Sequence, residues 1–137
     1  MTERGSILPL VAGLLALCGV FVVGVIDSTN LALARTQLQS IADGAALAAA
    51  QSITPNNAAV TGGRLVIALT PATIRSAARQ FVRDSAEPGV RVSAGTTPDG
   101  RTAIVTLTRV WRAPIASELI PLRLRLTATA RARTIFG

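Results

Sequence analysis

The hydrophobic pattern of this chain is dominated by one uninterrupted apolar run near the N-terminus. The run extends from Ile7 to Ile26, ILPLVAGLLALCGVFVVGVI, and contains no charged residue. A helix of this length spans the ~30 Å hydrocarbon core of a bilayer at ~1.5 Å per residue. A buried core helix of a soluble protein is the alternative, but such a helix usually carries a polar stripe, and no segment of comparable hydrophobicity is present to cover it. The run therefore predicts one transmembrane helix.

The segment after this run has helical periodicity with a narrower apolar stripe. Residues 27–54 are rich in alanine, the residue with the highest helix propensity. Apolar positions recur there at alternating spacings of three and four, so they share one side of a helix. This stripe packs either on the chain's own domain or, as we expect, on neighbouring copies or partner subunits. The predicted helix-packing stripe consists of Leu31, Ala34, Leu38, Ile41, Ala45 and Ala48.

The rest of the chain has the pattern of a small domain with strands and one helix. Residues 55–63 are small and polar and predict a linker, and RLVIAL at 64–69 predicts a short strand. Thr70 and Pro71 are typical of a helix start, with Thr as N-cap and Pro at the first helical position. Alternating residues on both sides of a Pro- and Gly-containing turn at 97–101 predict a β-hairpin, with a bulge or strand end near Arg109.

The clearest strand is the last one, over residues 122–133. Leucine and alanine occupy its even positions, and Arg or Thr occupies every odd position. Such strict alternation indicates an antiparallel sheet with one buried and one solvated face. Trp111 is a candidate core anchor of this domain. The arginines of the solvated face form a candidate face for an anionic partner: Arg123, Arg125, Arg131 and Arg133.

These elements together predict an α+β fold of pilin-like organisation. A long N-terminal transmembrane and amphipathic helix is followed by a small antiparallel sheet with one packed helix. The predicted organisation is a cytoplasmic tail (1–6), a transmembrane helix (7–26), an Ala-rich amphipathic helix (27–54), a linker (55–63) and an extracytoplasmic α+β domain (64–137).

The charge distribution favours an anionic partner outside the cytoplasm. The formal net charge is +7, and residues 64–137 carry twelve Arg against four acidic residues. Nucleic acid is disfavoured, because a membrane anchor exports the domain and the aromatic residues needed for base stacking are scarce. An acidic subunit, anionic headgroups or an anionic envelope polymer fits better.

Histidine and cysteine usage argues against catalysis and metal binding. The chain has no His, and its one Cys, Cys18, lies within the apolar run. Zinc sites and His-based triads need residues that are missing here. We therefore expect no enzymatic activity, no metal and no cofactor.

The charges flanking the apolar run predict its orientation. Arg4 precedes the run, whereas Asp27 follows it directly, which places the N-terminus in the cytoplasm and the C-terminal domain outside. A cleaved secretory signal is the alternative. The length of the run and the strongly helical sequence after it argue against that alternative.

The N-terminal residues resemble the signature of TadE/TadG-like proteins of the tight-adherence (Flp) pilus system, particularly its short actinobacterial forms. The resemblance rests on an Arg-Gly-Ser start, the apolar run, Asp27 and the block ADGAALAAA at 42–50 after a Leu-Gln pair. It covers about the first 52 residues, and LTATARAR at 126–133 is weakly similar to the last strand of the family. The family implies a membrane-anchored pseudopilin-like or assembly component.

Gly5 is a candidate processing site, because prepilins are cut after a Gly. They carry a Glu at the fifth mature position, however, whereas this chain has Leu10 there. The resemblance therefore favours an uncleaved anchor. The predicted function is non-enzymatic: pilus or secretion-apparatus assembly through contacts with other pilin-like proteins or copies of itself. A membrane-tethered basic module that binds anionic surface polymers is the alternative.

Overall fold

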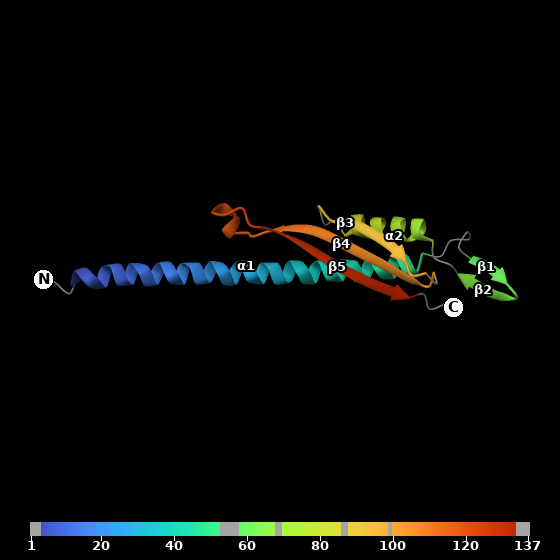
Figure 1. Ribbon diagram of the computed structural model, residues 1–137, viewed down its shortest axis with the longest axis horizontal. Helices are drawn as coiled ribbons and strands as arrows, with labels where there is room; N and C mark the ends of the chain where they lie inside the picture. The colour runs from blue at the N-terminus through green and yellow to red at the C-terminus, as the bar shows by residue number, and fades with distance from the viewer. Residues whose placement is uncertain (1–3, 53–57, 68–69, 86–87, 99, 134–137) are drawn as a thin grey trace. The chain divides into compact units, whose positions relative to one another are not determined.

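The computed structural model describes residues 4–52, 58–67, 70–85, 88–98 and 100–133. It confirms the α+β class, with a long N-terminal helix, a second helix and a three-stranded antiparallel sheet (Figure 1). The elements are α1 (Arg4–Ala50), β1 (Ala58–Thr61), β2 (Arg64–Ile67), α2 (Pro71–Asp84), β3 (Arg91–Thr96), β4 (Thr102–Arg112), the short 3-10 helix η2 (Ala116–Glu118) and β5 (Arg123–Arg133).

The chain forms two compact units. The N-terminal unit contains residues 1–33 and 112–123, and the sheet unit contains residues 34–111 and 124–137. The loop between β4 and β5 therefore belongs to the same unit as the apolar run, although it is far from that run in sequence.

Helix α1 is one continuous helix of 47 residues that includes both predicted helices. It begins at Arg4, so three residues of the expected tail are helical, and Pro9 lies within it. The helix ends at Ala50, before the Pro- and Asn-containing sequence that we expected to end it, and residues 53–57 lie outside the described part. Alanine and leucine favour the helical state throughout this stretch.

The sheet of the second unit is antiparallel, with strand order β3-β4-β5. Strands β3 and β4 form the predicted hairpin, in which Arg91 pairs with Thr108 and Thr96 with Ala103. The connecting turn has a 2.9 Å hydrogen bond from Gly100 N to the Thr97 carbonyl oxygen, and Gly100 has a φ of 67°. Glycine adopts this left-handed conformation without a steric penalty, which explains its position in the turn.

Burial follows the predicted alternation in β4 and in β5 from Leu126 onward. In β4 the buried residues are at odd positions, including Leu107 and Trp111, so Trp111 is the core anchor that the sequence predicted. Of the bulge or strand end expected near Arg109, the strand end is wrong, because β4 continues to Arg112 and its odd positions stay buried or half-buried through Trp111. In β5 the buried side chains are Leu126, Ala128 and Ala130, whereas Leu122 and Leu124 of the predicted buried face are exposed.

Helix α2 begins at Pro71 with Thr70 as its N-cap, as the sequence predicted. It packs on β3, and its buried side chains are Ile74, Ala78 and Val82. Because proline lacks an N–H and has a fixed φ, it fits the first helical position.

Residues 58–61, which we expected to belong to a linker, form strand β1 instead. This strand pairs antiparallel with β2, with Thr61 opposite Arg64. Gly62 and Gly63 make the two-residue turn and have φ values of 61° and 78°. A type I′ hairpin turn needs positive φ at both central residues, which Gly-Gly supplies.

Candidate assembly site

The apolar run is exposed along almost its whole length within the N-terminal unit. Among residues 5–26 only Val23 is even half-buried. In the described part of the chain, α1 is the one helix long and apolar enough to cross a membrane. Its most apolar 18-residue stretch has a mean hydropathy of 2.6, and none of that stretch is buried. An exposed apolar surface of this size requires lipid or another protein around it.

The predicted helix-packing stripe is partly used by the chain's own sheet unit. Ala34, Leu38 and Ala45 are buried, and Leu31, Ile41 and Ala48 are half-buried. The most deeply buried line is shifted slightly around the helix, because Ala42 and Ala49 are both 0% exposed. Contact of this stripe with a second chain remains a prediction for its half-buried members.

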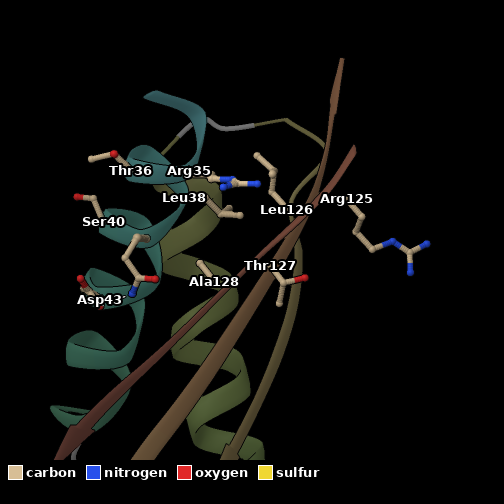
Figure 2. Close-up of a pocket in the computed structure, with 10 residues that line it drawn as sticks. Arg35, Thr36, Leu38, Ser40, Asp43, Arg125, Leu126, Thr127 and Ala128 are labelled. Carbon is tan, nitrogen blue, oxygen red and sulfur yellow. Dashed lines mark hydrogen bonds between the residues drawn. The ribbon is translucent and has the colours of Figure 1, made fainter. Parts of the chain in front are cut away.

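An open groove of about 810 Å³ separates α1 from β5 in the sheet unit. Figure 2 shows Leu38 of α1 pointing toward Leu126 and Ala128 of β5, whereas Arg125 points away from the helix. Arg35 borders the groove on the helix side. The groove therefore has an apolar floor, and its remaining lining is polar and carries both signs of charge, including Arg35 and Asp43.

Two side-chain contacts fix α1 against the rest of the sheet unit. Gln39 Nε2 donates to Asp43 Oδ1 at 3.0 Å and to the Thr129 carbonyl oxygen at 3.4 Å, which ties the helix to β5. The ring of Phe81 lies over Gly44, where an added Cβ would be 2.7 Å from Phe81 Cε1. Within the Ala-rich block, glycine at 44 is thus needed for the close approach of α2.

All four arginines of the candidate anionic-partner face are exposed on β5. They are Arg123, Arg125, Arg131 and Arg133. Residues two apart in a strand are ~6.6 Å apart on the same face, so the two pairs present regularly spaced positive charges. The exposed hydroxyl of Thr129 lies between these pairs and is 3.2 Å from Thr106 Oγ1 on β4.

A contact in the N-terminal unit was not predicted from the sequence. The Asp27 carboxylate is 8% exposed and accepts two backbone hydrogen bonds, from Ile115 N at 3.2 Å and Ala116 N at 3.0 Å. The sequence feature that could have indicated this contact is a single acidic residue, Asp27, directly after twenty apolar residues. Its partner, 88 residues away, could not be identified from periodicity.

A single long apolar helix followed by a small antiparallel α+β unit is compatible with a membrane anchor. Residues 5–52 match the model of the Tad family, Flp pilus-assembly TadE/G-like. The matched segment begins at Gly5 and ends just after α1, and it does not include the weak resemblance at 126–133. No curated protein and no solved structure matches the chain.

The family match bears on the function of α1. The matched segment is similar to a family of Flp pilus-assembly proteins, whose role is structural rather than catalytic, and the apolar helix fits membrane anchoring. The matched segment contains the complete apolar run, the helix-packing stripe and Gly44, so the residues that carry the family signature are those of α1.

Proposed function

We propose that this chain is a membrane-anchored, non-enzymatic, pseudopilin-like component of Flp pilus assembly that acts through helix–helix and subunit contacts. The observation that carries the proposal is the coincidence of the family match with α1, whose apolar half is exposed. The N-terminus is cytoplasmic and the sheet unit is outside, because Arg4 and Asp27 flank the span in the order that the positive-inside rule favours.

Small residues on the span provide the places where another helix can approach closely. Ala12 and Ala16 lie one turn apart and are both exposed, as are Gly24 and Ser28. In lipid, helices associate through close packing of such small-xxx-small pairs, since the lipid tails are as apolar as the side chains. The mechanism is therefore lateral association within the bilayer, followed by subunit contacts of the sheet unit.

Deletion of the gene in the source organism tests the role, with surface pili counted by electron microscopy. We expect deletion to remove most pili and the wild-type gene to restore them. A variant with Ala12→Ile and Ala16→Ile should fail to restore them, because the added methyl groups keep the helix apolar but prevent close approach. Leu10→Ile and Leu17→Ile change exposed residues without changing volume and form the matched control.

The outcomes separate the role from its mechanism. Normal pili after deletion would contradict the role itself. Normal pili with the Ala12→Ile, Ala16→Ile variant, after deletion has abolished them, would contradict helix packing at this pair alone. Failure of the matched control would show that the assay reports general damage to the span.

A second candidate function is a tethered basic module that binds an anionic envelope polymer. The observation that favours it is the exposure of all four arginines of β5. Exposed arginines bind phosphate groups through planar, bidentate hydrogen bonds, and such binding weakens as salt increases.

Binding of the full chain in neutral-lipid nanodiscs to teichoic acid tests this candidate. Changing Arg123, Arg125, Arg131 and Arg133 to Gln should abolish salt-sensitive binding. The matched control changes Arg75, Arg79 and Arg83 of α2, which are also exposed, to Gln. Equal loss in both variants would show that net charge, and not the β5 face, holds the polymer.

A further inference from the structure

The loop between β4 and β5 exposes large apolar side chains. Among the residues whose burial the structure describes, every exposed large hydrophobic side chain beyond α1 lies between Val110 and Leu124. Two consecutive residues directly after η2 are the extreme cases: Leu119 is 86% exposed and Ile120 is 62% exposed. Adjacent exposed apolar side chains of this size are typical of a surface that contacts a membrane or another protein.

This loop is fastened to α1 where the apolar run ends. The two hydrogen bonds from Ile115 and Ala116 to Asp27 hold it against the first charged residue after the run. Figure 1 shows the loop, which carries η2, alongside α1. Val23, one turn closer to the N-terminus on the same side as Asp27, is half-buried, whereas its neighbours are exposed.

The backbone N–H groups of the loop are hydrogen-bonded within the protein, as an environment with little water requires. Each N–H from Ala113 to Leu122 has an acceptor, and Pro114 and Pro121 have no N–H to satisfy. The acceptors are Asp27 for two of the groups and carbonyl oxygens of the loop itself for the others. Backbone groups that enter the lipid interface need internal partners, because each unsatisfied one costs several kcal/mol in hydrocarbon.

Positively charged side chains at both ends of the loop suit contact with the phosphates of the headgroup layer. Arg112 and Arg123 flank it, and both are exposed. Arginine at a membrane boundary extends its guanidinium to lipid phosphates while its aliphatic part remains in the apolar layer. Glu118, also exposed, is the one carboxylate of the loop, so the flanking arginines outnumber it.

We propose that residues 113–122 form a membrane-interface loop, which inserts Leu119 and Ile120 into the leaflet at the end of the α1 span while Arg112 and Arg123 contact lipid phosphates. The occupant of the exposed apolar surface is the bilayer that already surrounds the span, because Asp27 holds the loop at the depth where α1 leaves the hydrocarbon. The proposal depends on the span being in a bilayer and not on the pilus role.

The test uses the full chain with Cys18→Ala, reconstituted in vesicles of phosphatidylcholine and phosphatidylglycerol. Leu119→Cys is labelled with the environment-sensitive dye NBD, and lipids spin-labelled near the headgroup serve as quenchers. We expect a blue-shifted emission and a quenching of about half the signal at the leaflet surface. Thr127→Cys, an exposed position on β5, is the matched control and should not be quenched.

A second labelled position and a fold control keep the test decisive. Ile120→Cys should behave as Leu119→Cys does, and an unchanged emission maximum of the buried Trp111 shows that labelling leaves the fold intact. Unquenched dye at both loop positions would overturn the proposal. Equal quenching at Thr127 would also overturn it. A dye signal at the loop that changes only when protein is added would overturn it as well, since the loop would then bind a subunit.

Discussion

Replacing Asp27 by alanine removes a side chain that holds the β4–β5 loop against α1 through two hydrogen bonds. The carboxylate is 8% exposed and accepts from Ile115 N at 3.2 Å and from Ala116 N at 3.0 Å. Alanine has no acceptor, so both N–H groups lose their partner. Because alanine favours the helical state, the substitution should leave α1 itself intact.

The expected change in the free energy of loop opening follows from the two hydrogen bonds. A hydrogen bond to a charged group contributes about 1.5–3 kcal/mol to stability. The two bonds share one carboxylate, and both donors belong to half-buried residues, so the lower value applies to each. We expect the closed loop to lose about 3 kcal/mol relative to the open loop, which corresponds to about 100-fold in its opening equilibrium.

Hydrogen–deuterium exchange of the full chain in nanodiscs measures this equilibrium directly. The peptide that contains residues 113–122 should exchange about 100-fold faster at two amides in Asp27→Ala, and α1 should be unaffected. Asp27→Asn, which keeps an uncharged acceptor, should give an intermediate rate.

The control for this experiment is Asp43→Ala on the same helix. Asp43 is exposed and accepts from the Gln39 side chain, not from the loop, so its removal should leave exchange at residues 115 and 116 unchanged. Exchange at these two amides that is equal in wild type and Asp27→Ala would refute the reasoning, since the loop would then be held by its own hydrogen bonds alone.

Two further predictions concern α1. Gly44→Ala should destabilise the sheet unit by about 1–2 kcal/mol in denaturant titration, because the clash with Phe81 exceeds the helix-propensity gain of about 1 kcal/mol. Phe81→Leu should remove the penalty of Gly44→Ala, and a penalty that persists would contradict the contact. The intact mass of the protein extracted from membranes should correspond to a chain that starts at Met1 or Thr2, because Leu10 departs from the prepilin pattern. A chain that starts at Ser6 would mean cleavage after Gly5.

The elements with long, regular patterns were predictable from the sequence. The apolar run, the Ala-rich helix, the Thr70–Pro71 helix start and the alternation of β5 each depend on local periodicity, which the fold preserves. The β1–β2 hairpin was missed because small polar residues resemble a linker, although the pair Gly62-Gly63 carried the signal for a two-residue turn.

The contacts between distant segments were not predictable in the same way. Gly44 was visible as a glycine in an Ala-rich helix, but its partner Phe81 depends on how α2 packs. The link from Asp27 to Ile115 likewise joins residues 88 apart. Periodicity identifies which side of an element is apolar, but it does not identify which other element covers that side.

The distribution of burial along α1 determines what controls the association of this chain with others. From Ala34 onward one side of the helix is buried in its own sheet unit, whereas up to Ile26 its surface is left for lipid and other helices. Helix association of this kind takes place in two dimensions, so the relevant concentration is protein per lipid and not protein per volume. Dilution with lipid should therefore separate the subunits, whereas dilution with buffer should not.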